Sequence, residues 1–511
     1  MALPDFFDRA LQSASQALRD FDDDRFTQAL LARPVTLAFD EAAITAAEGR
    51  ATLNLAVRLL ARLHPALELL PLGGAEHHVA SLSALARSIN PAIDIVEAPA
   101  AKRAAIVIGK THVDSAVAIH AGSDRWIAAV GTAAPVGSAD SLNPFGAGAA
   151  ACLAVANLFR AMFGEWLTKA DTDRDARFSL LNFETGERAA NANLPDGIDL
   201  GHVQLAGVGA IGNGFLWTLA NAPVLRGTLD VIDPEPIDLS NLQRYVLALR
   251  GNVGTDKVAL ATAALATSGL TVRPFKETWA EYAARGEILE HVAVALDTAR
   301  DRVQLQGSLP RRITNAWTQA GDLGLSRHGF GADCACLACL YLPSGKRRNE
   351  DEIVAEELGL GNEQAQLMRV RLMLHQGTPV DEPFVREIAA AAGVDVERLL
   401  PFVGLPLRSF RAKAVCGNAL LRAPDGGGAD TQVPLAFQSA LAGVMLAADV
   451  VAERGGLRER RPPTKSVLDV LRPLPERPSF AIGASRNGPA RCICRDPDWV
   501  DAYRTKHADA A

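Results

Sequence analysis

Short apolar runs alternate with longer helical patterns through the first third of the chain. The elements predicted there are strands at 35–39, 67–72, 94–97, 104–108, 116–120 and 126–130, and helices at 41–63, 77–89 and 147–163. Parallel strands need a crossover connection long enough to hold a helix, and this need produces such an alternation. The pattern therefore predicts a doubly wound α/β unit built on a parallel sheet.

The alternation begins again after a polar stretch. Strands and helices recur from Gly201 to about Asn315, then a charged, helix-biased segment follows, and a long apolar helix precedes a tail rich in proline and arginine. The predicted domains are a first α/β unit at 1–170, a linker at 171–196, a second α/β unit at 197–345, a helical insertion at 346–432, and a closing helix with the tail at 433–511.

Charge and composition narrow the choice of partners and compartment. The net charge is -7, and basic residues are scattered apart from a run at Arg458–Arg461, which we interpret as a solvated helix end. This balance predicts no nucleic-acid partner and no anionic membrane partner. The acidic start of the chain does not resemble a secretory signal, and no apolar run reaches the length of about 18 residues that a membrane span requires. We therefore expect a cytoplasmic protein.

A glycine-rich turn marks the start of the second unit. The apolar run at 203–206 leads into G-x-G-x-x-G at Gly207, Gly209 and Gly212, and Asp233 ends the next apolar run 21 residues after Gly212. Such glycines let a phosphate approach the backbone at a helix N-terminus, and an acid at that distance can bind a ribose hydroxyl. These features alone fit a nicotinamide-dependent oxidoreductase as well as other nucleotide-binding enzymes.

The residues after that acid are more specific. Asp233 is followed by a second acid, Glu235, and by Ser-Asn-Leu-Gln-Arg ending at Arg244; Lys257 comes next, and Asp297 ends an apolar run five residues before an arginine. In this order and at this spacing, the segment resembles the signature of the ThiF-like superfamily of ubiquitin-activating enzymes. The likeness covers roughly residues 200–345 and again 410–455.

The resemblance implies an ATP- and Mg²⁺-dependent adenylation. By position, it implies that Asp233 holds the ribose, that Asn241, Arg244 and Lys257 contact phosphates, and that Asp297 binds Mg²⁺. The residue types suit that chemistry, because cations must neutralise the triphosphate while pyrophosphate departs and an acid must hold the metal against the phosphates. A nicotinamide enzyme has little need of this set.

The chain departs from the family pattern at two positions, and its first unit departs further. Glu235 stands where the family usually has Asp, and Tyr245 where it usually has Gln. At the point equivalent to the glycine turn, the first unit has the acidic stretch 40–49, which would oppose a phosphate. We therefore interpret residues 1–170 as an inactive adenylation-like domain that forms an internal pseudo-dimer with the active one, and that could lend it Arg25 or Arg33. The predicted fold class is two tandem doubly wound, Rossmann-like units, the first degenerate, with a helical catalytic-cysteine insertion and a zinc knuckle.

Four of the seven cysteines predict a structural zinc site. Cys336 and Cys339 form a C-x-x-C pair, and Cys492 and Cys494 supply two more thiols near the end of the chain. Four thiolates make a closed tetrahedral site for Zn²⁺. The second pair is one residue shorter than the C-x-x-C usual in the family, and Cys334 offers a spare ligand.

The two remaining cysteines have different predicted roles. Cys152 lies in a helix of small residues, where a packing role is expected. Cys416 lies just before a glycine-rich stretch and the closing helix, and the resemblance implies that it is the thioester nucleophile. Nearby Arg408, Arg411 and Lys413 would favour its thiolate. Cys416, Arg244 and Asp297 are the predicted catalytic residues.

Together these features predict an enzyme that adenylates the C-terminal glycine of a ubiquitin-like protein, captures it on Cys416 and passes it to a ubiquitin-conjugating-like enzyme. The resemblance extends to the bacterial activating enzymes of Bil-type antiphage systems, and a further homodimer remains open. A sulfur-carrier adenylyltransferase of the thiamine or molybdopterin type is the second hypothesis. Weaker hypotheses are a nicotinamide-dependent oxidoreductase and a scaffold without catalytic activity.

Overall fold

The computed structural model describes residues 3–96, 104–319, 321–331, 334–342, 349–361, 363–415, 433–484 and 492–508. The chain divides into two compact units. The larger comprises 1–342 with 433–511, and the smaller comprises 343–432.

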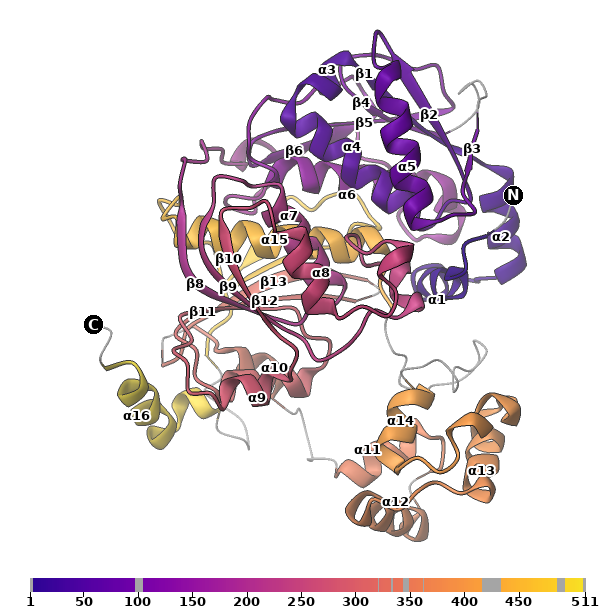
Figure 1. Ribbon diagram of the computed structural model, residues 1–511, viewed down its shortest axis with the longest axis vertical. Helices are drawn as coiled ribbons and strands as arrows, with labels where there is room; N and C mark the ends of the chain where they lie inside the picture. The colour runs from indigo at the N-terminus through magenta and orange to yellow at the C-terminus, as the bar shows by residue number, and fades with distance from the viewer. Residues whose placement is uncertain are drawn as a thin grey trace. The chain divides into compact units, whose positions relative to one another are not determined.

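The first half of the larger unit is built on a seven-stranded sheet (Figure 1). Its elements are α1 (Phe7–Ala17), α2 (Asp23–Ala32), β1 (Val35–Asp40), α3 (Glu41–Thr45), α4 (Ala47–Leu60), β2 (Ala66–Leu72), η1 (Glu76–His78), α5 (Val79–Ile89), β3 (Asp94–Ile95), β4 (Ala104–Ile108), β5 (Val117–Asp124), β6 (Ile127–Gly131), α6 (Phe145–Phe163), η2 (Gly164–Trp166), β7 (Ala176–Ser179) and η3 (Gly186–Arg188). The strand order is β3-β2-β1-β4-β5-β6-β7, and the first five are parallel while β6 and β7 run antiparallel to their neighbours.

The second half repeats this topology with one more strand. Its elements are β8 (Asp199–Ala206), α7 (Ala210–Ala220), β9 (Arg226–Ile232), η4 (Leu239–Gln243), η5 (Arg250–Asn252), α8 (Lys257–Ala264), β10 (Leu270–Phe275), α9 (Trp279–Ala283), β11 (His291–Val294), α10 (Ala299–Gly307), β12 (Ile313–Thr318), β13 (Leu323–His328), η6 (Leu337–Tyr341), α15 (Ala436–Arg454), β14 (Lys465–Leu468), β15 (Ser479–Phe480), η9 (Ile493–Arg495) and α16 (Pro497–Lys506). The order β10-β9-β8-β11-β12-β13-β14-β15 again places five parallel strands before the antiparallel ones.

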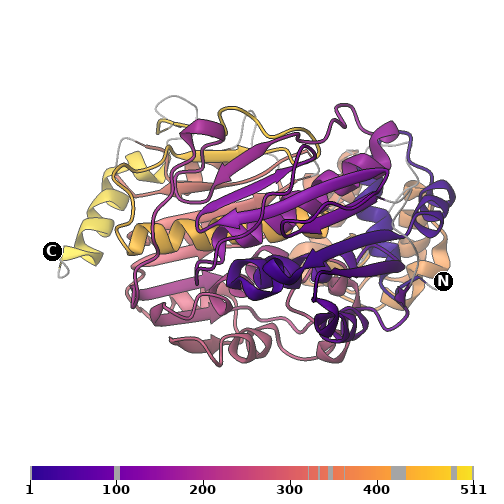
Figure 2. The same ribbon diagram turned by 90° about the horizontal axis from the view of Figure 1, so that it is seen from above.

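In each half, a long helix of small residues lies between the sixth and seventh strands in sequence, α6 in the first and α15 in the second. These two helices contact each other, and they contact α4 and α7 respectively, so four helices join the halves at their centre (Figures 1 and 2). Small residues allow the close approach: a Cβ on Gly214 of α7 would lie 2.7 Å from the carbonyl oxygen of Ala440 on α15. By length and composition both α6 and α15 could cross a membrane, but 94% of each apolar window is buried inside the molecule. They are core helices.

These findings confirm the predicted fold class of two tandem Rossmann-like α/β units, and they correct some details. Each sheet is mixed and not wholly parallel as expected, because the last strands of each half pair antiparallel. The helix expected at 41–63 is two helices, because Ala46 is extended (φ -71°, ψ 133°) and ends α3. The stretch 171–196, expected to be a linker, contributes β7, which pairs with β6 and completes the first sheet. The polar composition of this edge strand concealed it.

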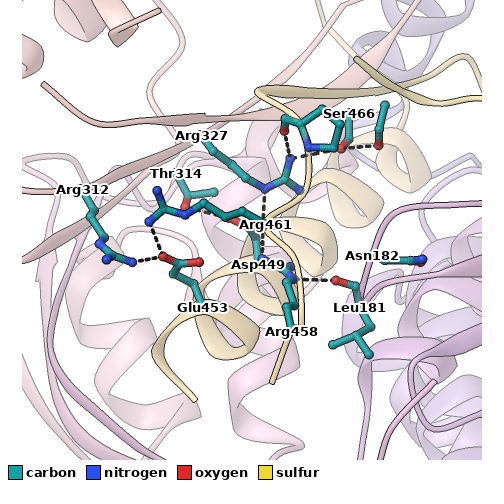
Figure 3. Close-up of polar contacts among 12 residues, drawn as sticks. Leu181, Asn182, Arg312, Thr314, Arg327, Asp449, Glu453, Arg458, Arg461 and Ser466 are labelled. Atoms are coloured by element: carbon teal, nitrogen blue, oxygen red, sulfur yellow. Dashed lines mark hydrogen bonds and ion pairs between the residues drawn. The ribbon is translucent and has the colours of Figure 1, made fainter. Parts of the chain in front are cut away.

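A buried ionic network joins α15 to the second sheet (Figure 3). Asp449 on α15 lies 2.6 Å from Arg327 Nε and 2.8 Å from Arg458 Nη1, and accepts a hydrogen bond from Thr314. Burial would raise the pKa of Asp449, but the two arginines hold it well below its usual value. The basic run is therefore not wholly solvated as expected: Arg458 is buried in this network, whereas Arg461 is exposed and pairs with Glu453.

The smaller unit is helical and has its own core. Its elements are α11 (Glu350–Glu357), α12 (Gln364–Gln376), α13 (Glu382–Ala392), η7 (Val396–Arg398), η8 (Leu400–Phe402) and α14 (Leu407–Val415). The apolar core includes Val354, Val370, Phe384 and Phe410. The unit, 343–432, overlaps the stretch 346–432 where an insertion is expected.

Candidate active site

The glycine turn lies at the point of the second sheet where the strand order reverses. It follows β8, and β9 and β11 pair with β8 on its two sides, so the carboxyl ends of all three strands meet there. Such a reversal is where open α/β sheets bind ligands. Gly207 has a φ of +93°, and a Cβ on it would lie 2.7 Å from the carbonyl oxygen of Ala295 at the end of β11. Only glycine fits this turn without displacing the neighbouring strand end.

The three glycines have different surroundings. A Cβ on Gly212 would lie 2.4 Å from the carbonyl oxygen of Gly207, whereas the one described atom within 4 Å of a Cβ on Gly209 is the Tyr245 hydroxyl, at 3.8 Å. Gly209 therefore leaves open space beside the turn. It is also the residue before α7, and no side chain of the described residues caps that helix. The uncapped N–H groups at the start of α7 are suited to bind an anion.

Asn213 fixes the conformation of the turn. Its amide nitrogen donates to the carbonyl oxygens of Val208 and Gly209, both at 3.0 Å, and its oxygen accepts from the N–H of Leu247 at 3.3 Å. The turn is thus tied to the segment that follows Arg244. Sequence reasoning missed this residue, although its place directly after Gly212 was a usable signal.

Asp233 and Lys257 lie together beside the turn. Asp233 Oδ2 accepts from the N–H of Val208 at 2.8 Å, and Lys257 Nζ is 3.7 Å from Asp233 Oδ1 and 2.5 Å from Glu235 Oε2. Burial raises the pKa of Asp233 more than Lys257 and the two backbone donors lower it. Burial would lower the pKa of Lys257, but Tyr245, Asp233 and Glu235 raise it above its usual value. The side chain of Lys257 is only 5% exposed and that of Glu235 is 68% exposed, so an incoming phosphate could take the place of Glu235.

Arg244 carries an unsatisfied donor. Its Nη1 is buried and has no hydrogen-bond partner among the described residues, and burial lowers its pKa. Its guanidinium carbon lies 5.6 Å from the centre of the Tyr245 ring, and Lys257 Nζ lies 5.5 Å from the same centre. Tyr245 therefore brings two cations to one aromatic ring. Asn241 caps η4 with its side-chain oxygen, which accepts from the N–H of Asp238 at 2.9 Å.

Asp297 follows β11 and is exposed. The negative charge of Asp297 raises the pKa of Arg244, so the Asp297 carboxylate lies near the Arg244 guanidinium. Arg302 on α10 donates to the carbonyl oxygens of Leu296 and Ala316 and so fixes the backbone that presents Asp297. The structure thus brings together the glycine turn, Asp233, Lys257, Arg244 and Asp297.

In the first sheet, the acidic side chain of Asp40 occupies the position equivalent to the glycine turn. Asp40, at the end of β1, caps α3 by accepting from the N–H of Ala43 at 3.0 Å, and it also accepts from the N–H of Lys110 and from the hydroxyl of Thr111, each at 2.7 Å. The loop after β6 crosses the same edge, since the N–H of Gly137 donates to the carbonyl oxygen of Gly109 at 3.1 Å. An acid occupies the helix N-terminus that is uncapped in the second half, which supports the prediction of a nucleotide-free first half.

Arg25 and Arg33 are engaged within the first half. Arg25 pairs with Glu165 at 2.7 Å, and Arg33 donates to the carbonyl oxygen of Met162 at 3.1 Å. Instead, Arg58 and Arg62 reach the second half, where they donate to carbonyl oxygens of the segment 245–248. The sequence did contain a signal for them, namely two arginines four residues apart in the apolar stretch from Leu55 to Leu63.

The four predicted zinc ligands converge from two distant segments. The Sγ atoms of Cys336, Cys339, Cys492 and Cys494 all lie within 4.8 Å of one another, with separations of 3.7 Å (336–339), 3.5 Å (336–492), 3.4 Å (339–492) and 3.5 Å (339–494). A tetrahedral Zn–S site requires Sγ atoms about 3.8 Å apart. The C-x-C spacing of the second pair does not prevent convergence, and Cys334 is exposed and outside the group.

A second group of candidate metal ligands is occupied by an arginine. His202, Asp230 and Glu287 lie close together, but Arg273 donates to both carboxylates, at 2.5 Å and 2.7 Å from its Nη2. The Tyr282 hydroxyl also donates to Asp230 at 2.5 Å. We interpret this group as a structural ionic network.

Cys416 lies outside the described residues. Of the cations expected to favour its thiolate, Arg408 pairs with Glu350 at 3.0 Å and Arg411 with Glu357. Cys152 is fully buried in α6, and burial raises the pKa of its thiol, in keeping with the predicted packing role.

Comparison with known proteins assigns the two halves to families. The model of the ThiF family matches residues 190–309, which hold the glycine turn, Asp233, Arg244, Lys257 and Asp297. The chain therefore contains a ThiF family domain. The model of Prokaryotic E2 family C matches residues 38–164 in the first half. The two halves thus match different families, although their strand orders are alike. The matched segment of the first half holds one cysteine, the buried Cys152.

This protein with a ThiF domain has a close relative along its whole length. It is 46% identical over 517 residues to "Uncharacterized protein y4jF" of Sinorhizobium fredii (strain NBRC 101917 / NGR234), covering 100% of this chain and 98% of the relative. Similar solved structures include E. coli MccB with ATP (14% identity, 58% of this chain, 67% of that chain, TM-score 0.35) and PaaA (17%, 53%, 69%, 0.28). The ThiF match supports an ATP-dependent adenylating enzyme.

Proposed function

We propose that this chain activates a ubiquitin-like protein by adenylating its C-terminal glycine and then captures it as a thioester on Cys416. The observation that carries the adenylation step is Arg244. Its buried Nη1 has no partner among the described residues, and it shares the ring of Tyr245 with Lys257 beside the open space at Gly209. Two cations and an uncapped helix N-terminus at one turn form a site for a polyanion.

In the first step, a carboxylate oxygen of the ubiquitin-like protein attacks the α-phosphorus of ATP, and pyrophosphate leaves. The N–H groups at the start of α7 hold a phosphate, and Lys257 and Arg244 neutralise the charge that accumulates as the bond to pyrophosphate breaks. Asp233 already accepts two backbone N–H groups, and a carboxylate has acceptor positions left for ribose hydroxyls. Mg²⁺, when bound, would offset the negative charge of the phosphates, and the exposed Asp297 is suited to hold it.

In the second step, the Cys416 thiolate attacks the acyl carbon and AMP leaves, which conserves the activated state of the carboxyl group. The thioester would then pass to the thiol of a ubiquitin-conjugating-like enzyme. The match of the first half to Prokaryotic E2 family C supports a bacterial conjugation system as the setting, and an antiphage system of the Bil type is the setting we propose. In this scheme the first half, with its closed edge, does not bind ATP.

The four convergent cysteines would hold one Zn²⁺. Four thiolates at tetrahedral separations leave no open coordination position, so the metal would be structural and would link η6 to the C-terminal η9.

ATP–pyrophosphate exchange and a non-reducing gel test the two steps separately. The wild-type protein, incubated with ATP, Mg²⁺ and a ubiquitin-like protein encoded beside it, should catalyse exchange and form a thiol-labile adduct. Cys416→Ala should keep the exchange and lose the adduct, whereas Cys334→Ala and Cys152→Ala should keep both. Exchange without an adduct in the wild type would instead indicate a sulfur-carrier adenylyltransferase. Absence of exchange with every carrier tested would contradict the proposal.

A further inference from the structure

Three polar side chains of the first half, spaced four residues apart, face the second half. They are Asn54 and Arg58 on α4 and Arg62 in the turn after it. Residues at this spacing lie on one side of a helix. The Asn54 oxygen accepts from Arg58 Nε at 2.9 Å and from the indole N–H of Trp217 on α7 at 3.1 Å, so the row begins in the central helix packing.

Arg58 and Arg62 bind one short segment of the second half. Arg58 Nη1 donates to the carbonyl oxygen of Val246 at 2.8 Å. Arg62 Nη2 donates to the carbonyl oxygens of Tyr245 at 2.6 Å and Ala248 at 2.7 Å. The guanidinium of Arg62 therefore binds both ends of the segment 245–248.

That segment lies between the groups expected to bind phosphate. It begins directly after Arg244 and includes Tyr245, whose ring is beside Arg244 and Lys257. Its Leu247 N–H donates to Asn213, which in turn holds the glycine turn through Val208 and Gly209. A shift of the segment would move Arg244, Tyr245 and the turn together.

The arrangement is costly, which argues that it serves more than packing. Arg62 is 1% exposed, and every acceptor that the described part of the chain offers it is a backbone carbonyl: those of Arg58, Tyr245 and Ala248. Arg58 is a second cation beside it, and burial lowers the pKa of Arg58 to about 10. Apolar residues of similar volume would pack here without burying charge. Only arginine supplies a planar guanidinium that can donate to two carbonyl oxygens at fixed geometry.

We propose that Arg62 is a positioning residue for ATP: the first half acts on the second by holding the segment 245–248, and thereby Arg244 and Tyr245, in the geometry that receives the triphosphate. The proposal rests on the proposed function, since it concerns the same nucleotide site. It gives the first half a function in catalysis without a nucleotide of its own. It also predicts that substitution of Arg62 weakens ATP binding and leaves the affinity for the ubiquitin-like protein unchanged.

The test uses the full-length chain with Arg62→Lys, Arg62→Met and Arg58→Gln. The matched control is Arg50→Lys, because Arg50 on α4 also donates to two backbone carbonyls, of Ile44 and Thr45, but within the first half. Kd for ATP·Mg²⁺ is measured by calorimetry without the carrier protein, and KM and kcat by pyrophosphate exchange. Thermal unfolding of each variant reports on folding.

Arg62→Met and Arg58→Gln should each weaken ATP binding about tenfold or more, the scale of a lost hydrogen bond to a charged group. Arg62→Lys should recover part of that loss, KM for ATP should rise more than kcat falls, and Arg50→Lys should match the wild type. If Arg62→Met does not fold, Arg62→Lys and Arg58→Gln decide the outcome. An unchanged Kd for ATP in the folded variants, or an equal loss in Arg50→Lys, would overturn the proposal. A wild-type protein that binds no ATP would overturn the proposed function instead.

Discussion

The backbone N–H of Val208 donates to Asp233 Oδ2 at 2.8 Å, so the acid at the end of β9 is bonded directly to the glycine turn after β8. The same carboxylate accepts from the N–H of Glu235 at 2.9 Å and lies 3.7 Å from Lys257 Nζ. One side chain therefore fixes the turn, orients the lysine and keeps acceptor positions that a ribose could use. These three roles can be separated by experiment.

Asp233→Asn should weaken ATP binding about tenfold, because the amide keeps an acceptor for Val208 but loses the charge that pairs with Lys257. If the carboxylate also holds the ribose, removal of a ribose hydroxyl should weaken binding to the wild type and have little further effect in Asp233→Asn. Calorimetry with ATP, 2′-deoxy-ATP and 3′-deoxy-ATP forms a double cycle that measures this coupling. Additive losses for both deoxynucleotides would show that Asp233 does not bind the ribose.

Zinc should be stoichiometric, with one ion per purified chain. Cys336→Ser should lose the metal and lower the melting temperature together, since the ion links η6 to the C-terminal segment and metal binding is coupled to folding. Cys334→Ser is the matched control, because Cys334 is close in sequence and outside the group. Metal analysis and thermal unfolding check both variants. A Cys336→Ser protein of unchanged stability would argue against a structural metal.

Local patterns were enough to predict most of the fold and the core of the site. The glycine turn, Asp233 and Lys257 stand at strand and helix ends that hydrophobic periodicity marks, and the reversal of strand order brings them together. Asn213 and Arg62 were not predicted, because their importance depends on which backbone carbonyls a distant segment presents. Strand β7 was missed since a four-residue edge strand carries little apolar signal.

The buried network around Asp230 should make stability depend on acid pH. Burial would raise the pKa of Asp230, but hydrogen bonds from His202, Arg273 and Tyr282 lower it from 3.8 to about 2. A carboxyl whose pKa is lower in the folded state stabilises the protein above its unfolded pKa, and this contribution is lost as the pH falls through the folded pKa. The contribution should therefore be about 2 kcal/mol at neutral pH and should disappear between about pH 4 and pH 2.

Urea unfolding of the wild type and of Asp230→Asn measures this contribution. The difference in the free energy of unfolding between the two proteins should be constant above about pH 5 and should narrow towards about pH 3. His202→Gln serves as a control, because it removes one hydrogen-bond partner of Asp230 and leaves Arg273 and Tyr282 in place. A difference that stays constant through the acid range would show that the charge of Asp230 does not contribute.

The network in Figure 3 predicts an asymmetry between its acid and its bases. The side chain of Asp449 is 2% exposed and pairs with both Arg327 and Arg458. One buried negative charge therefore balances two buried positive charges only in part. Asp449→Asn should cost about 3–5 kcal/mol of unfolding free energy, because it leaves two unpaired arginines inside the protein. Arg458→Met should cost less, since it leaves the pair of Asp449 and Arg327 with equal and opposite charges.

The double variant gives the sharper test. In the Asp449→Asn background, one of the two uncompensated cations is Arg458, so adding Arg458→Met should restore part of the lost stability even though Leu181 then loses a donor to its carbonyl oxygen. Denaturant unfolding of the wild type, both single variants and the double variant supplies the coupling energy. Arg461→Met is the control, since Arg461 is exposed and pairs with Glu453 rather than Asp449, and it should change stability little. Simple additivity of the two single effects would mean that burial of the arginines, and not their charge balance with Asp449, determines the stability of this junction.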